Sequence, residues 1–123
     1  MSAHEQAVYD ALRALGVAHE VLHHAPAYTM ADCLGLGLAP DIAYCKNLFL
    51  CNRQQTQFYL LLALADKAFR TAEVSRQLGV SRLSFAPERL LPEYLGLLAG
   101  AVSPFGLLFD SDRRVRLLVD ADL

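Results

Sequence analysis

The sequence has no tryptophan, only two lysines and no long apolar run. The lack of a long apolar run argues against a membrane-spanning helix. The longest unbroken apolar run covers residues 58–65, whereas a helix needs about 20 apolar residues to span a bilayer. The first residues also lack a basic segment followed by an apolar one, so no secretory signal is predicted. We therefore expect a cytoplasmic protein that has no membrane partner.

Cysteine is scarce as well, and its pattern argues against metal binding and structural disulfides. The three cysteines, Cys33, Cys45 and Cys51, are odd in number and form no CxxC pair, which is typical of a reduced protein with small buried thiols. The four histidines add no spacing that is typical of a zinc site. The glycine-rich loops that bind nucleotide phosphates are also missing. No metal or other cofactor is expected.

Charge is nearly balanced, because 13 acids oppose 11 lysines and arginines for a net charge of −2. This balance disfavours nucleic-acid binding through bulk positive charge, although a local basic patch is possible. Several arginines could form such a patch facing phosphate, or could simply be solvated surface charges: Arg76, Arg82, Arg89, Arg113, Arg114 and Arg116.

What the chain does have is enough apolar residues, 54% of 123, for one well-packed core. No linker, internal repeat or low-complexity segment divides it, so residues 1–123 are predicted to form a single domain. Apolar spacing and Gly16 predict a helix from Glu5 to Leu15. A short strand is expected at His19–His23, and a second helix from Thr29 to about Leu36 precedes a loop with Gly35, Gly37 and Pro40.

The strongest local signal is a hairpin, in which Tyr44–Cys51 pairs with Gln57–Leu64 across a polar turn. Further elements are expected along the rest of the chain: a helix at Thr71–Leu78, an extended piece at Ser81–Phe85, a helix from Pro87 to Leu95, and a second hairpin of Leu107–Phe109 with Val115–Val119. Interspersed helices and hairpins predict an α/β (α+β) fold with a mixed, mostly antiparallel sheet and flanking helices.

Lys46 is the first candidate for chemistry, since it interrupts a run, Tyr44–Leu50, that otherwise reads as an interior strand. A buried ammonium is costly unless it meets a partner or opens onto a cleft. Lys46 is therefore either an edge-strand lysine that reaches water or a cationic donor in a pocket. Asn47 beside it is expected on the opposite face, unless a bulge turns it into the same site.

The segment Gly100–Gly106 is the second candidate, because two glycines and Pro104 fix a loop whose backbone N–H groups could approach a ligand. An ordinary connecting turn explains the same pattern. Ser103 could donate its hydroxyl, but it lacks the G-x-S-x-G setting of a nucleophile. Cys45, a thiol next to Lys46, has no placed histidine and is a poor candidate nucleophile.

Three segments together resemble a known family: Lys46-Asn-Leu-Phe-Leu50 with its following hairpin, Ser81-Arg-Leu-Ser-Phe-Ala86, and Gly100-Ala-Val-Ser-Pro104-Phe-Gly106. Upstream, His24-Ala-Pro-Ala-Tyr-Thr29 is similar to the family's H-x-P-x-Y-T segment. The family is the YbaK/ProX family of prolyl-tRNA synthetase-associated editing domains, and the chain is most similar to the freestanding PrdX-type members. The resemblance covers essentially the whole chain in the right order.

The resemblance implies trans-editing, in which the aminoacyl ester of mischarged tRNA is hydrolysed. The substrate implied is a small amino acid such as alanine or cysteine on the tRNA for proline, and prolyl-tRNA synthetase is a possible partner. A pocket built for proline excludes a smaller side chain by only about 1–3 kcal/mol, so a second site has to remove the error. A non-catalytic module that binds tRNA or synthetase is the alternative.

Residue roles follow from the same resemblance. Lys46 would be the catalytic residue, its ammonium holding the terminal adenosine or stabilising charge that develops on the ester. The implied substrate-binding residues are Asn47, Tyr28 and Thr29, with Gly100, Ser103, Pro104 and Gly106 in the loop. Family members also continue beyond the position of Leu123, with a segment that contributes to the pocket. We therefore expect this sequence to lack part of the pocket wall and to expose a sheet edge or apolar patch that favours a homodimer.

Overall fold

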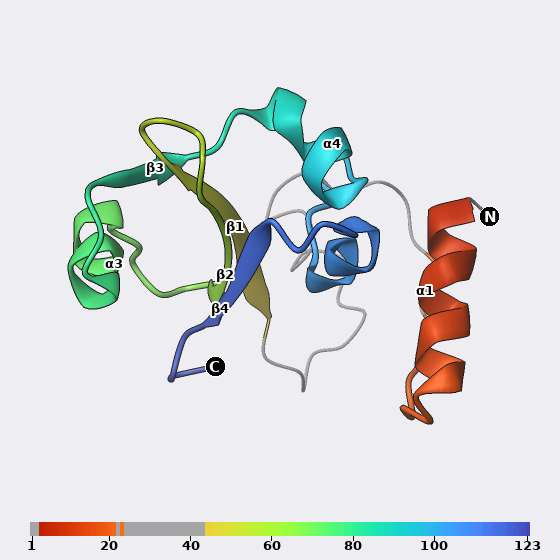
Figure 1. The fold of residues 1–123 in the computed structure, drawn as a ribbon. Helices are drawn as coiled ribbons and strands as arrows, with labels where there is room; N and C mark the ends of the chain where they lie inside the picture. Colours follow the sequence, from red (N-terminus) through yellow and green to blue (C-terminus); the bar gives the residue numbers. More distant parts are fainter. Residues whose placement is uncertain (1–2, 22, 24–43) are drawn as a thin grey trace.

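A four-stranded sheet with flanking helices forms the centre of the computed structural model, which describes residues 3–21, 23 and 44–123 (Figure 1). In chain order the elements are α1 (Ala3–Ala14), β1 (Cys45–Asn52), β2 (Phe58–Leu64), α3 (Thr71–Leu78), β3 (Leu83–Phe85), the 3-10 helix η1 (Glu88–Leu90), α4 (Leu91–Leu95), the 3-10 helix η2 (Pro104–Phe109) and β4 (Val115–Val119). The helix predicted from Thr29 and the loop after it lie outside the described residues.

The strands are arranged in the order β3-β1-β2-β4. β1 pairs antiparallel with both β2 and β3, whereas β4 runs parallel to β2. The predicted mixed, mostly antiparallel sheet is confirmed. Between β2 and β4 the chain passes through α3, β3, α4 and η2, which supplies the long crossover that a parallel pair requires.

The hairpin of β1 and β2 forms because two apolar runs are joined by a turn whose residues form hydrogen bonds with one another. Cys51 pairs with Phe58 at the end of the ladder. Beyond it, Asn52 Oδ1 accepts hydrogen bonds from the backbone N–H groups of Thr56 at 2.8 Å and Gln57 at 3.1 Å. Asparagine favours turns for this reason, and the first predicted hairpin is confirmed.

Alternation along the strands gives each face of the sheet its own apolar cluster. The α4 face, named after the helix that covers it, holds Phe49, Cys51, Phe58, Leu60 and Val115 under Leu91 and Leu95. The α3 face holds Leu50, Tyr59, Leu61 and Leu83, against which Val74 and Leu78 of α3 pack. Leu50 and Leu60 are fully buried, so burial on opposite faces fixes the register of the hairpin.

The predicted helices were largely right. α1 ends before Gly16 and α3 before Gly79, whose φ of +68° is a left-handed conformation that glycine adopts without strain. The helix predicted from Pro87 to Leu95 begins instead with the 3-10 turn η1 and continues as α4. In the described part of the chain, no helix is long and apolar enough to cross a membrane.

Two predicted strands were wrong. The described residues of His19–His23, namely 19–21 and 23, form no strand. Leu107–Phe109 belongs to η2, because Ser103 caps a helical turn in which Pro104 occupies the first position. There is thus no second hairpin, and β4 pairs with β2 rather than with Leu107–Phe109.

Candidate active site

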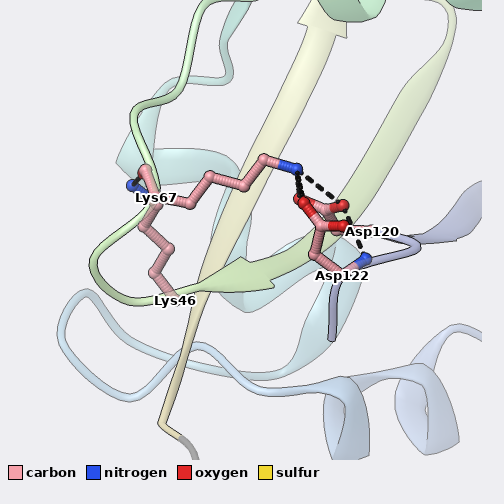
Figure 2. A network of polar contacts seen from close by, with 4 residues as sticks. All are labelled: Lys46, Lys67, Asp120 and Asp122. Atoms are coloured by element: carbon pink, nitrogen blue, oxygen red, sulfur yellow. Dashed lines mark hydrogen bonds and ion pairs between the residues drawn. The ribbon is translucent and has the colours of Figure 1, made fainter.

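Lys46, the predicted catalytic residue, is the second residue of β1 and is half-buried on the α3 face, opposite Ala63 of β2. Its Nζ donates a hydrogen bond to the backbone carbonyl oxygen of Lys67, in the loop after β2 (Figure 2). A carbonyl orients an ammonium without neutralising it. Within the described residues no carboxylate forms an ion pair with Lys46.

On the side away from β2, the start of β1 is unpaired as far as the structure describes the chain. β3 pairs only with Leu50–Asn52 of β1, and the Ala86 N–H adds one bond to the Phe49 carbonyl at 2.9 Å. No strand in the described part of the chain pairs with residues 45–48 on this side. Lys46 therefore lies on an internal strand, at a place where none of the described strands pairs with one side of it.

Lys67, in the loop after β2, forms two ion pairs with acids that follow β4. Its Nζ lies 2.7 Å from Asp120 Oδ2 and 2.6 Å from Asp122 Oδ2 (Figure 2). Asp120 Oδ1 also accepts a hydrogen bond from the Asp122 N–H at 3.1 Å. This clasp, formed by Lys67, Asp120 and Asp122, ties the loop that holds Lys46 to the turn after β4.

The clasp shifts the pKa values of its members in opposite directions. Hydrogen bonds to Asp120 and Asp122 raise the pKa of Lys67 above its usual value. The hydrogen bond from Lys67, followed by that from the Asp122 N–H, lowers the pKa of Asp120 below 3.8. The Asp120 contribution to stability is therefore present above the unfolded pKa and is lost as the pH falls through the folded pKa. The Lys67 contribution is present below 10.5 and is lost as the pH rises through the raised value.

We expect Asp120→Asn to lower the free energy of unfolding near neutral pH and to have a smaller effect at about pH 2, because the contribution of the charged carboxylate is lost as the pH falls through its lowered pKa. Asparagine keeps an oxygen that can accept the Asp122 N–H, so the change tests mainly the charge. Urea denaturation of both proteins at the two pH values measures the effect. An equal loss at both pH values would contradict a role for the ion pair.

An open cavity of about 550 Å³ lies on the α3 face, beside the clasp. Leu61, Ala63 and Leu118 supply apolar lining from the sheet, and Lys67, Asp120 and Asp122 supply charges. Ala63 is also the residue that pairs with Lys46. The cavity therefore adjoins the element on which the predicted catalytic residue lies.

Asn47 lies on the α4 face, opposite Leu62 of β2, as the strand period predicted. Its Oδ1 is buried and has no hydrogen-bond partner among the described residues. An unsatisfied buried polar atom costs about 1–3 kcal/mol. Such an atom beside the start of β1 is a candidate to accept a hydrogen bond from a ligand.

The loop from Gly100 to Gly106 serves mainly to pack η2 onto the α4 face. Ser103 Oγ accepts a hydrogen bond from the Phe105 N–H at 3.2 Å, which caps η2. A Cβ on Gly106 would come within 2.9 Å of Leu95 Cβ and 3.1 Å of the Leu95 carbonyl oxygen, so close packing against α4 disfavours a larger residue here. Gly100 has a φ of +85° and is exposed.

The structure thus does not bring all the predicted site residues to one face. Asn47 and the loop through Val102 belong to the α4 face, whereas Lys46 belongs to the α3 face. Tyr28 and Thr29 lie outside the described residues. Sequence reasoning missed Lys67, whose partners are more than fifty residues away in the chain; the paired acids of Val119–Leu123 were the one available signal.

The cysteines show no sign of a nucleophile. Cys45 is half-buried and Cys51 is buried, and neither is in a disulfide. Burial raises the pKa of the Cys51 thiol, which disfavours the reactive thiolate. Cys33 lies outside the described residues, and within the described ones no three His, Cys, Asp or Glu side chains gather as a metal site would require.

Comparison with known proteins decides the family. The family described as the aminoacyl-tRNA editing domain matches residues 24–123. The chain belongs to this family. The resemblance to YbaK/ProX proteins is also confirmed by the prolyl-tRNA editing protein ProX of Acetoanaerobium sticklandii, which is 34% identical over 119 residues, covering 97% of this chain and 73% of that protein.

A further relative supports the family of this editing-domain chain, and a solved structure supports its fold. The prolyl-tRNA synthetase associated domain-containing protein 1 of Danio rerio is 30% identical over 117 residues; the match covers 91% of this chain but only 60% of that protein. A crystal structure provisionally assigned to a trans-editing enzyme for prolyl tRNA synthetase has a TM-score of 0.74 and 20% identity, and the match covers all of this chain and 75% of that one. At that identity the structural likeness supports the fold alone.

Proposed function

We propose that this editing-domain chain is a trans-editing deacylase, which hydrolyses the ester of a small amino acid, such as alanine or cysteine, from mischarged tRNA for proline in the cytoplasm. The observation that carries the proposal is the ammonium of Lys46, which is half-buried at the start of β1 and has no carboxylate partner in the described residues. Its place within a chain of the aminoacyl-tRNA editing family supports the substrate class.

The chemistry assigned to Lys46 is electrostatic. Water adds to the ester carbonyl carbon, the bond to the ribose oxygen breaks, and the products are the free amino acid and the ribose hydroxyl of the tRNA. Negative charge develops on the carbonyl oxygen during the addition, and a nearby ammonium stabilises it more than it stabilises the neutral ester. The neighbouring ribose hydroxyl of the tRNA is the proposed helper of the attacking water.

The aminoacyl group is proposed to lie against the side of β1 that no described strand pairs with, because a ligand at an unpaired strand edge can reach side chains on both faces. Asn47 would accept a hydrogen bond from its amino group through the unpartnered Oδ1. The backbone at Gly100, with Ser103, Pro104 and Gly106, and the side chains of Tyr28 and Thr29 are proposed to complete the pocket. Prolyl-tRNA synthetase is a proposed partner, and the exposed Leu117 and Val119 of the edge strand β4 support a homodimer.

Deacylation of a panel of mischarged tRNAs tests the function. Proline tRNA charged with alanine, cysteine or serine is incubated with the purified chain, and correctly charged prolyl-tRNA is the matched control. We expect release of at least one small amino acid and no release of proline. A folded chain that hydrolyses none of them but binds tRNA would instead be the non-catalytic module.

A further inference from the structure

Several arginines that form no ion pair with the described residues lie at the end of the sheet far from Lys46. Arg53 follows β1, Arg82 precedes β3, and Arg113 lies two residues before β4. The register aligns these positions, because Asn52 pairs with Leu83, Cys51 with Phe58, and Phe58 with Val115. Arg116, the second residue of β4, is opposite Tyr59. We name Arg53, Arg82, Arg113 and Arg116 the arginine end.

All four side chains are exposed, and in the described part of the chain none of them forms an ion pair. Arg114 is different, since it lies 3.6 Å from Glu93 and 3.9 Å from the centre of the Tyr94 ring. The turn before β4 holds two acids. Asp110 is buried and accepts backbone N–H groups, which leaves Asp112 as the exposed acid of the same turn.

Charge is therefore separated along the sheet despite the net charge of −2. Figure 1 shows the β1–β2 turn and the C-terminus at opposite ends of the sheet. The acids Asp66, Asp120 and Asp122 lie at the end near the C-terminus, around the clasp. The arginine end spans three strand spacings, or about 14 Å, and such a row complements the regular charges of a phosphate backbone.

A groove of about 420 Å³ at the arginine end adds a second kind of contact. Arg53 and Arg82 line it together with Asn52, Ser84 and Phe85, and Phe85 is 59% exposed. An exposed aromatic ring beside arginines is the combination on which unpaired bases stack while their phosphates are bound. This pairing favours a nucleic acid over an acidic protein as the occupant.

We propose that the arginine end is the docking surface for the phosphate backbone of the tRNA substrate's acceptor arm. The inference rests on the proposed function, since it names how the substrate of that site is held. From Lys46 to Asn52 the strand advances six residues, or about 20 Å. A stacked strand of about six nucleotides, at roughly 3.4 Å each, covers the same distance.

The test measures binding of uncharged tRNA as a function of salt concentration, which requires no hydrolysis. Arg53→Gln, Arg82→Gln and Arg113→Gln are each compared with Arg13→Gln, which removes the same charge from an exposed arginine of α1. We expect each of the first three to weaken binding about tenfold at low salt. Each should also reduce the slope of log K against log salt by about 0.7–0.9, whereas Arg13→Gln should change neither.

A deacylation assay distinguishes failure of this inference from failure of the proposed function. On mischarged tRNA we expect the three variants to raise KM and leave kcat unchanged, because the docking surface is remote from the ester. If the chain proves inert but these variants still lose tRNA binding, the docking surface stands and the deacylase fails. Equal effects of Arg13→Gln, or an unchanged salt slope, would overturn the docking surface. The docking surface would also be overturned if the three variants lost binding to prolyl-tRNA synthetase but kept wild-type binding to tRNA.

Discussion

Lys46→Met is expected to lower kcat/KM for deacylation by about 10²–10³-fold, the cost of removing one preorganised donor to a developing oxyanion. Methionine keeps an unbranched apolar side chain at this half-buried position, so β1 should retain its packing. The melting temperature should stay close to that of the wild type. Initial rates on mischarged tRNA, measured beside a thermal melt, give both quantities.

The matched control for this loss of charge is Arg13→Gln, on the exposed helix α1, which should keep wild-type rates. Lys46→Arg adds a finer comparison. It retains the positive charge, but the larger planar group cannot take the compact position of the ammonium, so partial activity is expected. Full activity of Lys46→Met in a folded protein would show that the ammonium has no catalytic role.

Asp110→Ala is expected to destabilise the fold by about 2–4 kcal/mol, the largest stability effect that we foresee for a single polar side chain. Asp110 is only 7% exposed. Its Oδ1 accepts the Arg114 N–H at 3.0 Å and its Oδ2 accepts the Val115 N–H at 2.8 Å. Alanine would leave both groups without this acceptor at the point where β4 begins, and urea denaturation measures the loss.

Asp112→Ala is the control, since Asp112 has the same charge in the same turn but is exposed. It should change the free energy of unfolding by less than about 0.5 kcal/mol. The difference between the two variants isolates the hydrogen bonds of Asp110 from any general effect of charge in the turn. Similar values for both would show that the Asp110 carboxylate does not hold the turn.

Local patterns predicted local structure well. The hairpin of β1 and β2 could be predicted because two apolar runs and a polar turn lie within about twenty residues of each other in the sequence. The parallel pairing of β2 with β4 could not, since it depends on how the five intervening elements, α3, β3, η1, α4 and η2, fold back over the sheet. Leu107–Phe109 was misjudged because a short apolar run suits a strand or a helical turn, and the Ser103 cap selects the turn.

At the candidate site, too, local sequence patterns predicted some features and missed those that depend on tertiary packing. The strand period correctly placed Lys46 and Asn47 on opposite faces. It could not show which face the loop at Gly100–Gly106 covers, because that depends on the packing of η2 and Val102. Nor could it find the acceptor of the Lys46 ammonium, which lies on a loop that is positioned by contacts with distant residues.

The clasp of Lys67 with Asp120 and Asp122 connects the turn after β4 to Lys46, the candidate catalytic residue. The backbone oxygen that orients the Lys46 ammonium belongs to the same residue whose side chain is tied to the turn after β4. Loosening that turn would release the oxygen and let the amine sample more rotamers. We therefore expect order in the terminal turn and orientation of the amine to depend on each other.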